Sequence, residues 1–265
     1  MTATIHASAI VEAGARLGEN VVVGPFCHIG AKAQIGADSV LQSHVVVAGR
    51  TSIGARARIF PFVSIGTPSQ DLKAALSEGE VEIGADCIIR EGVTINAGAM
   101  TRIGDRCAFL AYSHVGHDCH LGDGVVLANN VLLGGHVEIG SEASIGGATA
   151  VHQNVRIGAH AFIGGLAGVE GDVIPFALAG GNRAHLFGLN VIGLQRRGFS
   201  AERIANLKAA YRRLFVSADT RALMQKIEDV AISHAADPDI SVLVEFLRAP
   251  SQRPLCAPRR RADTP

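Results

Sequence analysis

The 265-residue sequence contains no tryptophan, and aromatic residues make up only 5% of it. Its 24 basic and 24 acidic residues leave no net charge, so we expect no nucleic-acid partner. No apolar run approaches membrane-spanning length, and the N-terminus lacks the segments of a signal peptide, so we expect no membrane insertion. Five cysteines without metal-type CxxC pairs are typical of a reduced cytoplasmic protein.

Glycine, by contrast, is abundant, with 31 residues. An aliphatic residue stands at every sixth position from Ile5 to Ile65, eleven positions in a row. The same frame recurs from Ile103 to Val169, and a small or β-branched residue often stands four positions after the aliphatic one. Neither helical spacing nor strand alternation has a period of six. A short strand and a turn in every six residues explain it, which predicts a parallel β-helix of hexapeptide repeats.

In this fold three hexapeptides form one triangular coil, and coils stack at about 4.8 Å, the spacing of strands in a sheet. Residues 18 apart in uninterrupted sequence should therefore lie one above the other. The aliphatic and small residues point inward. Four cysteines occupy the small inward position, where we expect buried hydrophobic side chains without redox or metal roles. They are Cys27, Cys87, Cys107 and Cys119.

Two interruptions break the repeat. Residues 67–80 form an insert of about two hexapeptides, which contains Asp71 and Lys73. Two further residues are inserted between Ile95 and Ile103. Inserts on solenoids tend to form loops on the functional face, so we expect both to lie near a site.

The repeat gives way to a different pattern towards the C-terminus, and we assign residues 1–185 to the β-helix. Helical spacing of apolar residues predicts a small α-helical domain over residues 186–250. Ser200 is the expected N-cap of one helix, and Asp237–Pro238 is the expected start of the last one. The Pro- and Arg-rich segment 251–265 is predicted to be a disordered tail.

Three histidines, His114, His117 and His120, follow one another at intervals of three. On a side of six residues this spacing sends them to different parts of the coil, so they should not converge on a metal ion. We expect His114 at a corner of the coil. His120 is not part of a polar column beside an insert, so we interpret it as a solvated surface residue.

His117 does have polar companions. Adding 18 to its number gives Gly135, and adding 18 again gives Gln153, while Asp118 and His136 form the neighbouring column. The bare glycine would leave a backbone N–H accessible beside the imidazole. We therefore expect a polar patch that combines a histidine, a carboxylate and an open amide.

Several motifs resemble those of one family when read in this order. They are “HVGHDCHLGDGVVLANNVLLGGHVEIG”, “GGATAVHQNVRIGAH”, “QDLK” and “FGLNVIGLQRRGFS”. Over residues 5–250 the sequence is similar to the UDP-N-acetylglucosamine O-acyltransferases, which open lipid A synthesis. The resemblance implies a left-handed β-helix and a homotrimer with its sites between subunits. It also implies transfer of a 3-hydroxyacyl group from acyl carrier protein to the 3-hydroxyl of UDP-GlcNAc, with no cofactor and no metal.

The resemblance also assigns catalytic roles. His117 would be the general base that takes the proton of the attacking sugar hydroxyl. Asp118 would orient the imidazole, and the N–H of Gly135 would stabilise the oxyanion. Because a thiol leaves readily, a strong separate acid is not required. Direct transfer needs no covalent enzyme intermediate, and none of the cysteines is placed to form one.

Further residues have binding roles by the same resemblance. Those expected to contact the sugar or position the acyl chain are Asp71, Lys73, His114, His136 and Gln153. Those expected at the nucleotide end are His152, Asn190, Arg196 and Arg197. Gly165 matches a position that limits acyl-chain length, with Arg183 as the alternative determinant.

Two residues depart from the family pattern, and other functions stay open. Asn96 stands where a histidine is expected, and Ile192 replaces an acidic residue. The enzyme alternatives are an acetyl-CoA-dependent hexapeptide transferase and the later N-acyltransferase of the pathway. A solenoid carbonic anhydrase would need two histidines five apart, which this sequence lacks. The non-enzyme alternative is a structural solenoid, which would not require the His117 column.

Overall fold

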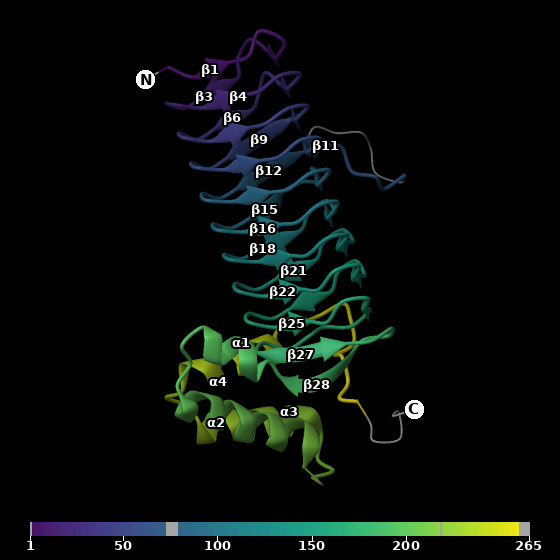
Figure 1. The fold of residues 1–265 in the computed structure, drawn as a ribbon. Coiled ribbons are helices and arrows are strands. Elements are labelled where there is room, and N and C mark those ends of the chain that lie inside the picture. Colours follow the sequence, from purple (N-terminus) through teal and green to yellow (C-terminus); the bar gives the residue numbers. More distant parts are fainter. Residues whose placement is uncertain (1, 73–78, 218, 260–265) are drawn as a thin grey trace.

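The computed structural model describes residues 2–72, 79–217 and 219–259. Within them the chain forms a tall triangular solenoid whose strands lie in three sheets of 11, 9 and 8 strands, here called sheets A, B and C (Figure 1). A small helical region closes the C-terminal end of the solenoid (Figure 1). The predicted class, a parallel β-helix followed by helices, is confirmed.

Each coil contributes one short strand to each sheet. Sheet A contains β1 (Thr4–Ile5), β4 (Val22–Val23), β7 (Val40–Leu41), β10 (Arg58–Ile59), β13 (Ile88–Ile89), β16 (Ala108–Phe109), β19 (Val126–Leu127), β22 (Ser144–Ile145), β25 (Phe162–Ile163), β27 (Ala177–Gly180) and β28 (His185–Leu189). Sheet B contains β2 (Ile10–Val11), β5 (His28–Ile29), β8 (Val46–Val47), β11 (Ser64–Thr67), β14 (Thr94–Asn96), β17 (His114–Val115), β20 (Leu132–Leu133), β23 (Ala150–Val151) and β26 (Gly168–Val169). Sheet C contains β3 (Arg16–Leu17), β6 (Gln34–Ile35), β9 (Arg50–Ile53), β12 (Glu80–Ile83), β15 (Thr101–Ile103), β18 (His120–Leu121), β21 (Glu138–Ile139) and β24 (Arg156–Ile157).

The register confirms the stacking rule and both interruptions. Partners in neighbouring coils are 18 residues apart, as in the pair Val40 and Arg58. Arg58 pairs with Ile88, 30 residues on, because the insert adds twelve residues to that coil. Ile88 pairs with Ala108, 20 residues on, because the second interruption adds two.

The corners between strands explain the polar residues of the repeat. Most corners are two-residue turns whose second residue adopts a left-handed backbone, as Asp118 (φ 57°), His136 (φ 59°) and Asn154 (φ 62°) do. Asn, Asp and His tolerate this region better than other non-glycine residues. A functional side chain at a corner is therefore held by a constrained turn.

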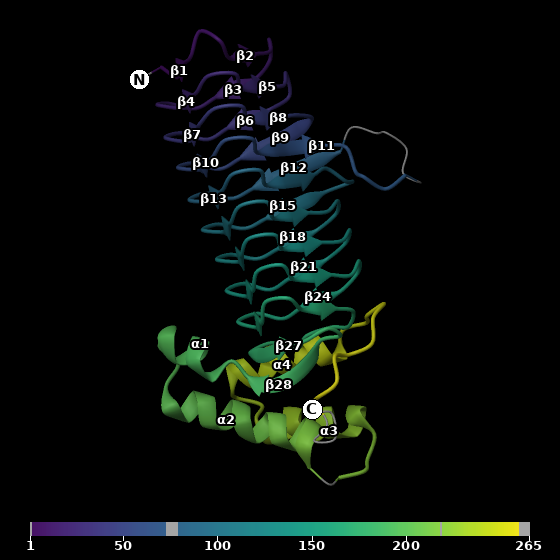
Figure 2. The ribbon, with the colours of Figure 1, turned by 45° about the vertical axis from the view of Figure 1, so that its right-hand side comes forward.

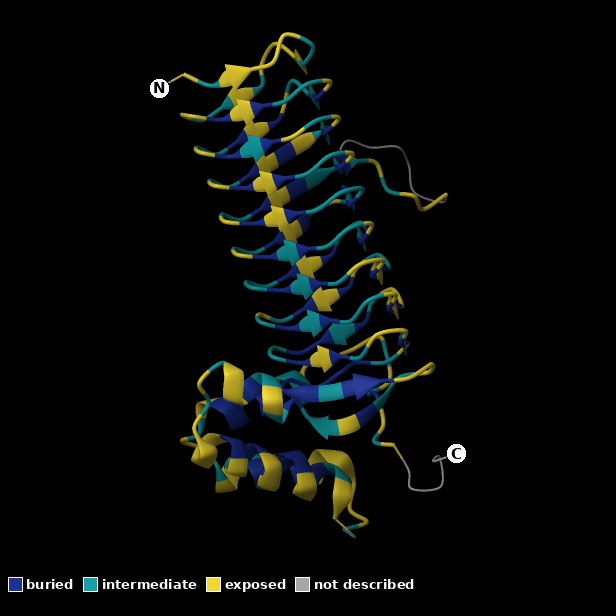
Figure 3. Cartoon of the chain, in the orientation of Figure 1, coloured by how far each residue is buried: buried dark blue, intermediate teal, exposed yellow. Residues whose placement is uncertain are grey.

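The core lies inside the prism and consists of buried aliphatic and small residues from all three sheets. Figure 3 shows buried residues in dark blue recurring along the coils. The four cysteines of the repeat are buried and unpaired, as predicted, with Cys119 fully buried. Burial raises the pKa of the Cys119 thiol to about 12, so this thiol is not a thiolate nucleophile at neutral pH.

The outer faces differ in polarity. Sheet C presents a charged ladder, whereas sheets A and B present exposed apolar side chains. On sheets A and B these are Val22, Ile88, Phe162, Ile10 and Leu132. The corner that joins sheets A and B is also apolar and carries Phe26, Phe62, Tyr112 and Leu166. Apolar surface of this extent marks an interaction surface.

After the last coil, β28 pairs antiparallel with β27 and leads into the helices. These are α1 (Val191–Arg196), α2 (Ala201–Tyr211), the π-helical turn η1 (Arg212–Val216), α3 (Leu223–Ser233) and α4 (Pro238–Arg248). Ser200 caps α2 through the amide of Arg203, and Asp237 caps α4 with Pro238 in its first turn, as expected. None of the helices in the described residues is long and apolar enough to cross a membrane.

The prediction of a disordered tail from residue 251 is wrong for residues 251–259. These residues run back beside the last coils (Figure 2). The amide of Asp172 donates to Pro254 O (2.8 Å), and the amide of Cys256 donates back to Asp172 O (2.8 Å). The Pro- and Arg-rich composition hid this pairing because backbone hydrogen bonds leave no side-chain signature. Residues 260–265 lie outside the described residues.

Candidate active site

His117 and Asp118 form the corner between sheets B and C, with His117 in the first turn position and Asp118 in the second. His117 Nδ1 lies 2.7 Å from Asp118 Oδ2. Because a carboxylate only accepts, Nδ1 carries the proton and Nε2 keeps a lone pair. Both side chains are largely buried, at 22% and 18% exposure. The arrangement is that of an oriented imidazole with one open acceptor atom.

Asp118 is itself fixed by the two-residue bulge that precedes β15. Its backbone amide donates to Thr101 Oγ1 (2.9 Å), and its carboxylate accepts from the amide of Met100 (3.2 Å). Burial alone would raise the pKa of Asp118, but the His117 and Met100 hydrogen bonds and the nearby histidine charges outweigh it and lower the pKa. In the sequence, the two-residue bulge is the only sign of these contacts.

Gly135 stacks directly above His117. A Cβ atom at this position would lie 2.5 Å from His117 Nε2, so only glycine leaves room for the imidazole. Within the described residues, the Gly135 amide donates no backbone hydrogen bond. An open N–H therefore lies on the same column as the open nitrogen of His117.

Gln153 continues the His117 column, and His136 stacks over Asp118 in the neighbouring one, as the 18-residue spacing predicts. His136 Nε2 lies 3.8 Å from Asp118 Oδ2, and its ring meets that of His117 edge-on at 5.0 Å. The ligand atoms of His117, Asp118 and His136 all lie within 4.8 Å of one another, so this cluster could hold a metal ion. Gln153 occupies the same turn position as Gly135 one coil further on.

The three evenly spaced histidines lie on three different parts of the coil. His117 is at the corner, and His120 is on sheet C, where it pairs with Glu138. The expectation of a corner position for His114 is wrong, because His114 lies in β17 of sheet B. Its Nδ1 contacts Thr94 Oγ1 at 2.7 Å. Burial, and the neighbouring His117, lower the pKa of His114, which favours a neutral ring.

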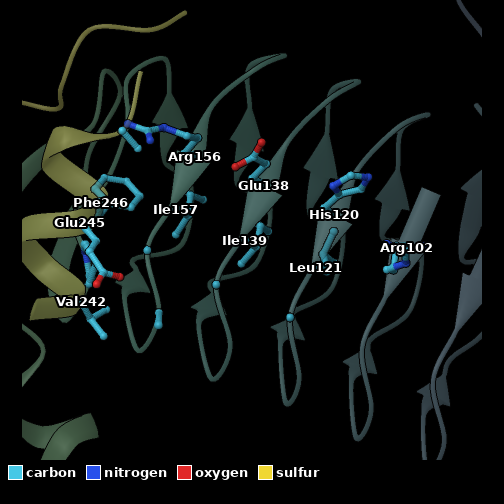
Figure 4. Close-up of a pocket in the computed structure, with 16 residues that line it drawn as sticks. Arg102, His120, Leu121, Glu138, Ile139, Arg156, Ile157, Val242, Glu245 and Phe246 are labelled. Atoms are coloured by element: carbon cyan, nitrogen blue, oxygen red, sulfur yellow. The ribbon is translucent and has the colours of Figure 1, made fainter. Parts of the chain in front are cut away.

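A cavity of about 640 Å³ opens on sheet C between the coils and α4. Figure 4 shows Arg102, His120, Glu138 and Arg156 on successive coils, with Phe246 of α4 beside Arg156. None of the predicted site residues lines this cavity. A second hollow, of about 440 Å³, adjoins the His117 corner instead, and Asp118 and His136 are part of its wall.

The long insert begins and ends beside the bulge. Asn96, which is buried, donates from Nδ2 to Thr67 Oγ1 (3.1 Å), and the amide of Glu80 donates to Gly98 O (3.0 Å). Asn96 therefore ties the insert to the bulge that supports Asp118. Asp71 lies on the described part of the insert, where its amide donates to a serine hydroxyl. Lys73 lies outside the described residues.

Three of the four residues expected at the nucleotide end lie away from the His117 corner. Asn190, Arg196 and Arg197 line a cavity of about 690 Å³ over the end of sheet A, together with the exposed Ile192. Asn190 caps α1, accepting from the amide of Gly193 at 3.1 Å. His152, in contrast, lies next to Gln153 in the His117 column.

The two arginines are not equivalent. Arg197 Nε lies 3.0 Å from Glu142 Oε2, and Arg197 Nη2 donates to Glu142 O at 2.8 Å. Arg197 therefore anchors α1 to the solenoid. Arg196 is exposed on the wall of the cavity and makes no ion pair within the described residues.

The two residues expected to govern acyl length lie near the end of the solenoid. Gly165 is exposed at the corner between sheets A and B. Arg183 follows β27, and its Nε lies 3.3 Å from Glu170 Oε2. A single chain therefore places the residues around His117 side by side. The α1 cavity and the Gly165 corner lie on other faces of the prism.

Comparison with known proteins agrees with this geometry. Residues 14–49 and 100–135 match the bacterial transferase hexapeptide family, and residues 172–256 match the second domain of UDP-N-acetylglucosamine O-acyltransferase. The acyl-[acyl-carrier-protein]–UDP-N-acetylglucosamine O-acyltransferase of Brucella ovis is 46% identical over 96% of this chain and 92% of its own length.

Solved structures give the same result. The UDP-N-acetylglucosamine O-acyltransferase of Moraxella catarrhalis superimposes with a TM-score of 0.90 at 38% identity, covering 95% of this chain and 98% of its own. The acyltransferase of Campylobacter jejuni gives a TM-score of 0.90 at 34% identity, covering 97% of this chain and 100% of its own.

The solenoid and its polar corner define a hexapeptide-repeat transferase. Within that class, the extent of these similarities decides between the alternatives. The chain belongs to the acyl-[acyl-carrier-protein]–UDP-N-acetylglucosamine O-acyltransferase family.

Replacing Gly135 tests the column directly. Gly135→Ala places a Cβ atom where His117 Nε2 now lies, so the imidazole must move. We expect kcat/KM for acyl transfer to fall by about 10²-fold, the cost of a misplacement of about 1 Å. The control is Gly30→Ala on an early coil, where the nearest atom to the new Cβ is 3.3 Å away. Equal rates for the two variants would contradict the stacked arrangement.

Proposed function

We propose that this enzyme transfers a 3-hydroxyacyl chain from acyl carrier protein to the glucosamine 3-hydroxyl of UDP-GlcNAc, the first step of lipid A biosynthesis. Acyl carrier protein and UDP-GlcNAc appear in the names of the relatives, and the hydroxyl and the acyl type follow from the family resemblance. The observation that carries the mechanism is the hydrogen bond from His117 Nδ1 to Asp118, which leaves Nε2 open beneath Gly135.

The reaction is a direct transfer. The sugar hydroxyl attacks the thioester carbonyl carbon while His117 Nε2 accepts the hydroxyl proton. The new C–O bond forms, the carbonyl oxygen becomes an oxyanion, and the C–S bond then breaks. The thiolate leaves and recovers a proton from the imidazolium, which returns His117 to its starting state. No cysteine takes part, in keeping with the burial of the thiols.

Asp118 and Gly135 stabilise the charges that develop. The carboxylate of Asp118 faces the imidazolium as it forms, and its lowered pKa keeps it ionised at neutral pH. The N–H of Gly135 would donate to the oxyanion, because a fixed backbone donor in a site closed to water stabilises such charge strongly. His136 and Gln153 lie beside these groups, where they would contact the sugar.

We further infer that three copies of the chain assemble around the apolar corner. The apolar faces on sheets A and B differ, so they would meet in a heterologous contact, which forms a closed trimer when the rotation between copies is a third of a turn. A neighbouring copy would then cover sheet B and bring its α1 cavity towards the His117 corner. This assembly would supply the second wall and the exposed Arg196, whose planar guanidinium suits a diphosphate.

The His117, Asp118 and His136 cluster also favours a second candidate, a metal-assisted reaction. A bound metal would need deprotonated ligand atoms, and His117 Nδ1 already donates to Asp118 at 2.7 Å. The hydrogen-bonded pair therefore supports the general base. Transfer that survives dialysis against a strong chelator agrees with this choice.

The role of His117 is tested against a matched histidine. His117→Ala is expected to lower kcat by about 10²–10⁴-fold, the usual contribution of a positioned base. His120→Ala removes an imidazole only three residues away, on sheet C, and should leave kcat within about twofold. The products are measured by mass spectrometry with UDP-GlcNAc and 3-hydroxyacyl carrier protein. Near-normal turnover of His117→Ala, or loss of transfer on chelation, would overturn the assignment.

Chain length is tested at Gly165. We propose that the acyl chain runs from the His117 corner across sheet B to the apolar corner, where Gly165 leaves the groove open. Gly165→Met should shift the preferred donor towards shorter chains, measured with a panel of acyl carrier thioesters of different length. An unchanged product profile would point to another determinant, for which Arg183 is the next candidate.

A further inference from the structure

The segment after α4, residues 250–259, forms a strap along the end of the solenoid (Figure 2). Two sets of backbone hydrogen bonds hold it. One joins Pro254 and Cys256 to Asp172, and the other joins Ala257 and Arg259 to Leu186 at 2.9 and 3.0 Å. Within the strap, the side chain of Cys256 is buried. The strap is therefore part of the fold.

The strap carries Arg253 to the top of the His117 column. Arg253 Nε donates to Gln153 O at 2.8 Å, and Arg253 Nη2 contacts His152 Nδ1. Gln153 lies one coil beyond Gly135, and Gly135 lies one coil beyond His117. The guanidinium thus stands about 9–10 Å along the column from His117, two coil spacings.

The start of the strap lines the hollow beside the corner. Pro250, Ser251 and Gln252 line the cavity of about 440 Å³ together with Asp118 and His136. A segment far away in sequence therefore completes the surroundings of the candidate active site.

The guanidinium of Arg253 has N–H donors beyond those used in the contacts above. It carries five N–H groups in a rigid fork and accepts no hydrogen bonds. Nε and Nη2 hold the Gln153 carbonyl and His152, and among the described residues Nη1 donates to no partner. The His152 ring lies against the guanidinium, and its Nδ1 is also 3.3 Å from Gln153 O. Arg253 therefore keeps N–H groups for a further acceptor beside this ring.

We propose that Arg253 is a substrate-binding residue that holds the phosphate groups of the nucleotide sugar. The inference rests on the proposed function, which places the sugar hydroxyl at His117 Nε2. The sugar ring and its anomeric diphosphate then extend along the column over a length comparable to two coil spacings. A fixed fork of N–H groups at that distance matches the geometry of phosphate oxygens.

The test compares Arg253→Ala with Arg253→Lys and with Arg259→Ala. Arg259 is on the same strap, with its guanidinium carbon 5.6 Å from the ring centroid of Phe187, so its removal is a matched loss of charge away from the site. Binding of UDP and of uridine is measured by calorimetry, and KM and kcat are measured in the transfer assay. Thermal unfolding confirms that each variant folds.

We expect Arg253→Ala to weaken UDP binding and raise KM for UDP-GlcNAc by about 10–100-fold, the loss of charge-assisted hydrogen bonds. Uridine binding and kcat should change by less than about threefold, since neither involves the phosphates. Arg253→Lys should be intermediate, because it keeps the charge and loses the fork. Arg259→Ala should resemble the unmodified enzyme.

Three results would overturn the inference: unchanged UDP binding in Arg253→Ala, an equal loss in Arg259→Ala, or an equal loss for uridine. The proposed function would be contradicted by a different result, the absence of acyl transfer by the unmodified enzyme. The UDP measurement requires no turnover, so the two failures are distinguishable.

Discussion

The six-residue period is the constraint on which the rest of the structure depends. It places one strand and one corner in every hexapeptide, so that each residue lies over the residue 18 positions earlier. At most corners the second residue adopts a left-handed backbone, a region that Asp, Asn and His tolerate. Asp118 meets this demand with a side chain that also fixes His117. Backbone geometry and site chemistry are satisfied by the same residue.

The candidate site arises where the chain departs from the regular repeat. The two-residue bulge brings the Met100 amide to Asp118, and the long insert is tied to that bulge through Asn96. At Gly135 a corner lacks a side chain, which leaves space for His117 Nε2. The strap adds Arg253 from the far end of the sequence. A regular solenoid gives a rigid frame, and these departures supply its polar groups.

The sequence predicted the fold and the His117 column because both follow from counting residues in a fixed period. Sequence analysis does not predict contacts between residues that are not related by a fixed spacing. His114 was expected at a corner but lies in β17. The strap was expected to be disordered, although backbone pairing with Asp172 and Leu186 holds it. The pairing of Arg197 with Glu142 depends on how α1 packs on the solenoid, which no local pattern records. Arg253 reaches Gln153 across 100 residues of sequence for the same reason.

A single chain leaves the His117 corner and the α1 cavity on different faces, so the central claim is that the site forms between copies. Mixing His117→Ala with Arg196→Ala before assembly tests it most directly, at UDP-GlcNAc concentrations where each variant alone is nearly inactive. In random trimers about a quarter of the sites combine an intact His117 from one copy with an intact Arg196 from the next. The account predicts recovery towards that fraction of the unmodified activity. A mixture no more active than the sum of the two variants would contradict it.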